Sequence, residues 1–125
     1  MVANVKSGGS QTVVDARSRD LFLGKGTEPK PGIQVGHIRF AKNVPFFKLL
    51  DDEKMSMKDP EQLKEIFSRH EVDLSKSITT SCGSGVSACI VAFAAHLSGA
   101  EDVSVYDGSW SEWSKRASAD LVATD

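Results

Sequence analysis

Cysteine is scarce in this chain: there are only two, Cys82 and Cys89, in 125 residues. They form no Cys-x-x-Cys pair, and the three histidines, His37, His70 and His96, are widely scattered. This pattern argues against a disulfide scaffold and the common metal-binding spacings, and it favours a reducing compartment. We therefore expect no metal or other cofactor, and we expect the histidines to lie at the surface or to take part in packing.

The sequence also lacks a strong excess of one charge and lacks long apolar runs. Fifteen basic and seventeen acidic residues give a net charge of −2, and no basic cluster contains interleaved aromatics. No apolar run approaches the length of a bilayer span, and residues 1–10 lack the apolar stretch of a signal peptide. We therefore expect no nucleic-acid partner and no membrane partner, and a cytoplasmic or mitochondrial protein.

The length and composition fit one ordinary hydrophobic core. With 125 residues, 40% of them hydrophobic, the chain is too short for two cores. We predict a single domain over residues 1–125. Residues 1–10 are similar to the end of a helix and its turn, so we expect this chain to be either an excised part of a longer protein or a truncated natural product.

The most informative stretch is residues 82–87, Cys-Gly-Ser-Gly-Val-Ser. The segment before it, residues 77–81, is rich in β-branched residues and predicts a strand that leads into Cys82. After it, apolar residues at helical spacing predict a helix from Ser84 or Gly85 to about Ser98, with Gly99 as its cap. The apolar positions of this predicted helix are Val86, Cys89, Ile90, Phe93 and Leu97.

A strand, a tight loop and a helix in this order produce a reactive cysteine. The loop N–H groups and the positive end of the helix dipole converge on one point, where a thiolate is stabilised. Gly83 and Gly85 let the backbone curl around the sulfur, and Ser84 adds a hydroxyl nearby. By contrast, Cys89 lies on the apolar side of the predicted helix, so we expect it to be buried and structural.

The rest of the chain alternates predicted strands and helices. Residues 13–17 predict a buried strand with Asp15 and Arg17 at its carboxyl end, residues 24–36 a long loop, and residues 41–46 a second strand. The charged residues 49–58 predict a poorly ordered connection or part of a helix. This alternation favours an α/β fold with a mostly parallel sheet and helices on both faces.

Two further helices have recognisable starts. Asp59-Pro60 with Gln62 predicts a capping box and a helix that runs to about residue 70, with Leu63, Ile66 and Phe67 on its buried face. Near the C-terminus, residues 103–106 predict a strand and residues 107–108 a turn. Ser109 with Glu112 repeats the capping-box pattern and begins a last helix that carries Trp110 and Trp113. These two rings either pack in the core or border the site.

Together these segments resemble a rhodanese domain, in particular the carboxy-terminal catalytic domain of the 3-mercaptopyruvate sulfurtransferases. The matching segments, in the family's order, are residues 13–17, 36–38, 43–46, 72–76, 82–87 and 106–113. The resemblance implies a five-stranded parallel sheet flanked by helices. It also implies that Cys82 is the catalytic residue and carries a sulfane sulfur as a persulfide.

The loop sequence then bears on the sulfur donor. Thiosulfate-using relatives place cationic side chains after the cysteine, whereas Gly83 and Ser84 carry no charge, which favours mercaptopyruvate. Related phosphatases have an arginine six positions after the cysteine, where this chain has Ala88. The resemblance gives Ser84 the role of orienting the substrate or relaying a proton. It gives the backbone N–H groups of residues 83–87 the role of stabilising the anionic sulfur.

Three positions depart from the family pattern. Leu21 stands where the family has the arginine that binds the substrate carboxylate; Arg17, Arg19, Lys25 and Lys30 are the nearby cations that could replace it. Arg39-Phe40 stands in place of a small turn that contains glycine. The family is generally a tandem of two such domains, so a second rhodanese domain is an expected partner.

The expected reaction moves sulfur from 3-mercaptopyruvate to a thiol acceptor, either a small molecule or thioredoxin, and releases pyruvate. Two alternatives stay open from the sequence. One is a single-domain sulfurtransferase that uses thiosulfate or another persulfide donor. The other is a weakly active regulatory or binding module.

Overall fold

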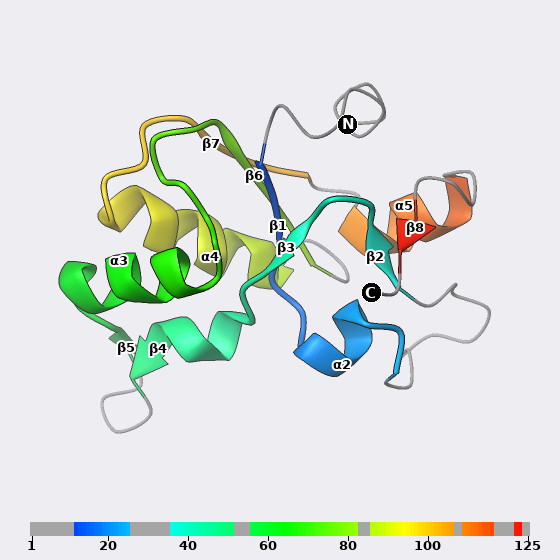
Figure 1. Cartoon of the computed structure of the whole chain (residues 1–125), viewed down its shortest axis with the longest axis horizontal. Coiled ribbons are helices and arrows are strands. Elements are labelled where there is room, and N and C mark those ends of the chain that lie inside the picture. The colour runs from blue at the N-terminus through cyan, green and yellow to red at the C-terminus, as the bar shows by residue number, and fades with distance from the viewer. Residues whose placement is uncertain are drawn as a thin grey trace.

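The computed structural model describes residues 12–25, 36–51, 56–82, 86–106, 109–116 and 122–123 (Figure 1). In chain order the elements are β1 (Thr12–Asp15), α2 (Arg19–Phe22), β2 (His37–Ile38), β3 (Lys42–Asn43), the 3-10 helix η1 (Phe46–Leu49), β4 (Leu50–Asp51), β5 (Ser56–Met57), α3 (Pro60–Arg69), β6 (Ile78–Ser81), α4 (Val86–Leu97), β7 (Val103–Val105), α5 (Ser109–Arg116) and β8 (Val122–Ala123). The predictions for residues 1–10, most of the 24–36 loop and the 107–108 turn lie outside these residues.

The central sheet is parallel, as predicted, with the strand order β3-β1-β6-β7. Within the described residues it has four strands, whereas the resemblance implied five. The other strands form two separate antiparallel pairs, β2 with β8 and β4 with β5. Consecutive strands in a parallel sheet need crossover segments, and the helices between them provide these.

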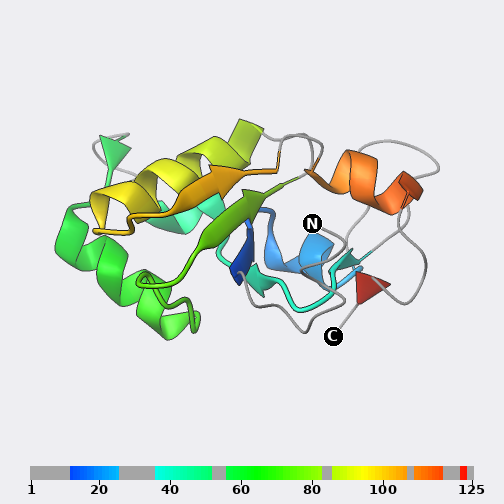
Figure 2. The ribbon, with the colours of Figure 1, turned by 90° about the horizontal axis from the view of Figure 1, so that it is seen from above.

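Side-chain alternation along β1 divides the apolar interior of this single domain into two clusters, one on each face of the sheet, instead of the one core that we predicted. Val14 faces the larger cluster, which includes residues of α3, α4 and η1, while Val13 faces the smaller cluster, which includes Trp110 and Trp113 of α5. Figures 1 and 2 show α3 and α4 on one side of the sheet and α5 with the β2–β8 pair on the other. The prediction of helices on both faces is therefore confirmed, and both tryptophans are core residues.

Helix α3 begins and ends as predicted. Asp59 accepts a hydrogen bond from the backbone N–H of Gln62, the Gln62 side chain bonds back to the Asp59 N–H, and Pro60 occupies the first turn. Leu63 and Phe67 are completely buried, and Ile66 packs against the same core. The capping box fixes the start of the helix, and the apolar spacing fixes its buried face.

The prediction for helix α4 is right in extent and wrong in orientation. Ala88, Val91, Ala94 and Ala95 are buried against the sheet, while Phe93 is 54% exposed and Leu97 38% exposed. Cys89 is exposed too, so its expected burial is wrong. The helix is apolar on nearly all sides, which means that spacing alone does not select a face. The small alanines lie on the buried side, where they allow α4 to approach the strands closely.

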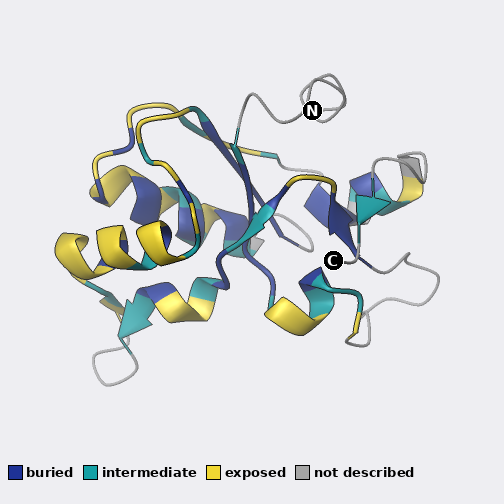
Figure 3. Cartoon of the chain, in the orientation of Figure 1, coloured by how far each residue is buried: buried dark blue, intermediate teal, exposed yellow. Residues whose placement is uncertain are grey.

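The segment between β1 and α3 also differs from the prediction. The expected strand over residues 41–46 is reduced to Lys42–Asn43, because η1 begins at Phe46. Residues 50–51 and 56–57 form the antiparallel β4–β5 pair, where the sequence predicted a poorly ordered connection or part of a helix; residues 52–55 lie outside the described residues. Figure 3 shows the buried central strands in dark blue and the exposed turns of α3 in yellow.

Candidate active site

The carboxyl ends of three parallel strands meet at one edge of the sheet. Asp15, the last residue of β1, lies beside Asn43 of β3 and beside Ser81 of β6. The Asn43 side-chain amide donates to the carbonyls of Asp15 and Arg17, at 3.1 and 2.9 Å. This edge is where α/β proteins place their functional groups, because the loops that leave the strands converge there.

Cys82 is the first residue after β6 at this edge and is 2% exposed. Its backbone is held on both sides by the first turn of α5. The Cys82 N–H donates to the Ser109 hydroxyl at 3.0 Å, and the Cys82 carbonyl accepts from the Trp110 N–H at 2.8 Å. The position of this cysteine is thus fixed by a segment 27 residues further along the chain.

Ser109 takes a role that its sequence pattern did not reveal. Its hydroxyl accepts from Cys82 and donates to the Tyr106 carbonyl at 2.8 Å, and the Glu112 carboxylate accepts from the Tyr106 hydroxyl at 2.9 Å. The predicted capping box between Ser109 and Glu112 is therefore wrong. Ser109 is completely buried and has a φ of 49°, a conformation that is rare outside glycine. Local spacing contained no signal for a partner so distant in sequence.

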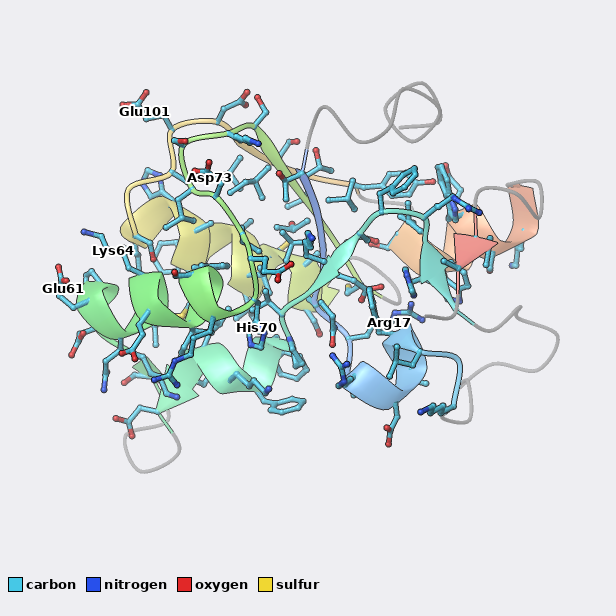
Figure 4. All side chains as sticks on the ribbon, in the orientation of Figure 1. Arg17, Glu61, Lys64, His70, Asp73 and Glu101 are labelled. Carbon is cyan, nitrogen blue, oxygen red and sulfur yellow. The ribbon has the colours of Figure 1, made fainter. Side chains whose placement is uncertain are left out.

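Arg17 lies in a buried cluster beneath the same edge. Its guanidinium binds both carboxylate oxygens of Asp15, with Nη2–Oδ2 at 2.9 Å, and donates to the Gly36 carbonyl at 2.6 Å. It also lies 4.8 Å from the centre of the Trp110 ring. Figure 4 labels Arg17 near α2 and β2. A guanidinium so engaged and 5% exposed is suited to fix the strand ends, and it is poorly placed to bind a substrate carboxylate.

The predicted loop is described only at its two ends. Gly83, Ser84 and Gly85 lie outside the described residues, while Val86 begins α4 and Ser87 follows it. Because the first N–H groups of an α-helix have no acceptor within the helix, this end can stabilise an anion. Thr80 also ties the strand to the helix, since its hydroxyl donates to the Ala88 carbonyl at 2.9 Å.

Leu21 lies on α2 and is half-buried, whereas its neighbour Phe22 is buried. Its backbone N–H donates weakly to the Ser18 hydroxyl at 3.4 Å, which makes Ser18 the N-cap of this short helix. The Leu21 side chain supplies no charge at the position where the resemblance implies an arginine. Arg19 and Lys25 are exposed, and Lys30 lies outside the described residues.

The histidines match the prediction that they lie at the surface or in packing. His37 is buried, its ring is stacked on Phe22 with 3.6 Å between centroids, and its Nδ1 lies 2.6 Å from the Phe22 carbonyl. His96 is exposed, and the half-buried His70 is the C-cap residue that follows α3. In the part of the chain that the structure describes, no three His, Cys, Asp or Glu side chains gather as a metal site would require. Among the same residues, no helix is long and apolar enough to cross a bilayer.

Comparison with known proteins gives a consistent result. The family model described as "Rhodanese-like domain" matches residues 2–116. The chain is 46% identical over 113 residues to mouse 3-mercaptopyruvate sulfurtransferase, and 47% identical over 108 residues to rat thiosulfate sulfurtransferase. These matches cover 90% and 84% of this chain but only 38% and 35% of the two relatives.

The structural comparison agrees with the sequence comparison. The Tum1 protein of Saccharomyces cerevisiae superposes with a TM-score of 0.87 at 34% identity, over 97% of this chain and 43% of that one. The parallel sheet, the cysteine at the end of β6 and the family match point to the same conclusion. The chain belongs to the rhodanese family.

Proposed function

We propose that this domain is a rhodanese-type sulfurtransferase in which Cys82 carries the transferred sulfur. The observation that carries the proposal is the placement of Cys82 between β6 and the N-terminus of α4, with its backbone held by Ser109 and Trp110. The names of the relatives support the same reaction class. Because the chain spans little more than a third of those relatives, the activity of the whole protein is part of the proposal.

The proposed donor is 3-mercaptopyruvate. The Cys82 thiolate attacks the sulfur of the donor, the carbon–sulfur bond breaks, and its electron pair leaves with pyruvate as the enolate, which then takes up a proton. Cys82 is left as a persulfide. A thiol acceptor such as thioredoxin then attacks the outer sulfur, and the Cys82 thiolate leaves. Each half-reaction conserves sulfur and electrons.

The donor assignment rests on the loop sequence. Gly83 and Ser84 add no positive charge next to the sulfur, so the site is less suited to thiosulfate than a loop with cations would be. Ser84 is the proposed group that orients the donor or relays the proton, and the N–H groups of residues 83–87 stabilise the anionic sulfur. The similar identity to relatives of both names leaves thiosulfate as the second candidate donor.

The substrate carboxylate needs a cation, which Leu21 does not provide. Arg17 is bound to Asp15 inside the protein, so we assign it a positioning role in place of substrate binding. A second rhodanese domain, which the family pattern implies, is the proposed source of further residues at the site. The expected compartment is cytoplasmic or mitochondrial.

The test compares two cysteine variants in the same protein. Incubation with mercaptopyruvate should add one sulfur atom to Cys82, measured by mass spectrometry of the peptide, and should release pyruvate. Cys82→Ser should abolish both signals. Cys89→Ser removes the exposed cysteine and serves as the matched control, which should retain both.

The outcomes separate the alternatives. Faster persulfide formation with thiosulfate than with mercaptopyruvate would overturn the donor assignment while keeping the sulfurtransferase class. Absence of a Cys82 persulfide with both donors would contradict the enzymatic proposal and favour a regulatory or binding module. Leu21→Arg should lower the KM for mercaptopyruvate if the missing cation limits binding.

A further inference from the structure

A basic cavity lies away from Cys82, between η1 and the C-terminal end of α3. It has a volume of about 270 Å³ and is lined by Lys48, Lys58, Ile66, Arg69 and His70. Four of these five side chains are basic, and they come from η1, from the segment after β5 and from α3. Figure 4 labels His70 beside η1. Like charges held close together repel one another, and this repulsion raises the free energy of the folded protein unless solvent or a bound anion offsets it.

Among the described residues near this group, Glu65 neutralises one member and Glu71 pairs with a lysine outside it. Glu65 forms an ion pair with Arg69 on the exposed side of α3. Glu71, which follows His70, pairs with Lys42 at 3.3 Å. Neither of these two carboxylates pairs with Lys48 or Lys58, the other two permanently charged side chains of the cavity. Arg19 of α2 adds a further positive charge near His70.

The positive charges around the cavity affect the protonation of His70. Its pKa is held below the usual value, first by burial and then by the charges of Lys48 and Arg19. On its own helix the charged neighbours are Arg69 and Glu65, which are paired with each other. An anion bound among these groups would offset the repulsion from Lys48 and Arg19, so the imidazole would accept a proton more readily.

We propose that this cavity binds a free tetrahedral oxyanion such as sulfate or phosphate. The size fits, because about 30 Å³ per water molecule gives room for one such anion with part of its hydration shell. Lysine ammonium groups bind such anions as point charges, and a guanidinium and an imidazolium add directed donors. Ile66 forms the apolar part of the lining.

The site is linked to pH through His70. As the pH falls through the histidine range, the bound state gains a proton and a further positive charge faces the anion. Oxyanion binding should therefore tighten on acidification. Sulfate is the best probe because, unlike phosphate, it keeps the same charge over this pH range.

The experiment is a sulfate titration followed by the His70 ring resonances, at about pH 6 and about pH 8. Sodium chloride keeps the ionic strength constant. The His70 signals should shift saturably with sulfate, with tighter binding at the lower pH. Lys48→Gln and Lys58→Gln should each weaken binding about two- to fivefold. Lys76→Gln, an exposed lysine in another turn, is the matched control and should leave binding unchanged.

His70→Gln isolates the proton linkage. Because this variant has no His70 ring signal, isothermal titration calorimetry follows sulfate binding in it and in the unchanged protein. The variant should keep sulfate binding at the higher pH and lose the tightening at the lower one. Three results would overturn the proposal: an equal shift with chloride alone, equal weakening by Lys76→Gln and Lys48→Gln, or an unchanged pH dependence in His70→Gln. All variants concern exposed or half-exposed side chains, and circular dichroism checks their folding.

Discussion

Replacement of Ser109 by alanine tests whether the first turn of α5 holds Cys82. The variant loses the hydroxyl that accepts the Cys82 N–H at 3.0 Å. Both residues are almost completely buried, at 0% and 2% exposure, so no water easily replaces the lost acceptor. An unsatisfied buried donor costs about 1–3 kcal/mol. The Tyr106 carbonyl loses less, because it still accepts the Ser109 backbone N–H at 3.0 Å.

The expected result is a free energy of unfolding lower by about 1–3 kcal/mol, or a Tm lower by about 4 °C for each kcal/mol in a domain of this size. Urea denaturation and calorimetry measure these quantities. The rate of persulfide formation at Cys82 should fall as well, because the backbone of the nucleophile is less firmly positioned.

Two variants serve as controls for this loss. Ser109→Gly removes the same hydroxyl but relieves the φ of 49°, so it should be more stable than Ser109→Ala by about 1 kcal/mol. Ser114→Ala, on the same helix, removes a buried hydroxyl that has no hydrogen-bond partner among the described residues, so it should be neutral or stabilising. The reasoning is refuted if Ser109→Ala unfolds at the same urea concentration as Ser114→Ala.

Three further substitutions test local features of the fold. Asp59→Ala removes the N-cap of α3 and should lower the free energy of unfolding by about 1 kcal/mol in urea denaturation, while Asp59→Asn should lose less. Burial, Lys48 and Arg19 lower the pKa of His70 in the folded protein, so the unfolded chain binds this proton more readily. The contribution of His70 to the free energy of unfolding should be fully present above about pH 6.5 and should be lost as the pH falls below it. Urea denaturation at several pH values should show this slope, and His70→Gln should reduce it. Phe40 has a φ of 68° and is 56% exposed, so Phe40→Gly should raise Tm by relieving about 1 kcal/mol of backbone strain, whereas Phe40→Ala should not.

Several features were predictable because their causes are local. The capping box of Asp59 and Gln62 forms between residues three positions apart, and it fixed the start of α3 before any tertiary contact was known. The order of strand β6, Cys82 and helix α4 follows in the same way from β-branched residues, glycines and an apolar run. The family resemblance then connected this local pattern to a known chemistry.

The errors concern choices that only packing makes. The sequence of α4 is apolar on nearly every side, so its spacing could not show that Ala88 and Ala95 face the sheet while Cys89 and Phe93 face outward. The face with small side chains is the buried one, because small side chains allow the helix to pack closely against the strands. The β4–β5 pair was missed for a similar reason, since two-residue strands carry almost no periodic signal.

The sequence by itself determined the parallel α/β fold, the place of Cys82 at a strand end and the family to which the chain belongs, because each follows from short local patterns and from their order along the chain. The tertiary structure decided that Ser109 and Trp110 hold the Cys82 backbone and that Arg17 is bound to Asp15. It also decided that basic residues from separate elements share one cavity. These are contacts between segments far apart in the chain, and local spacing cannot specify which distant groups will meet.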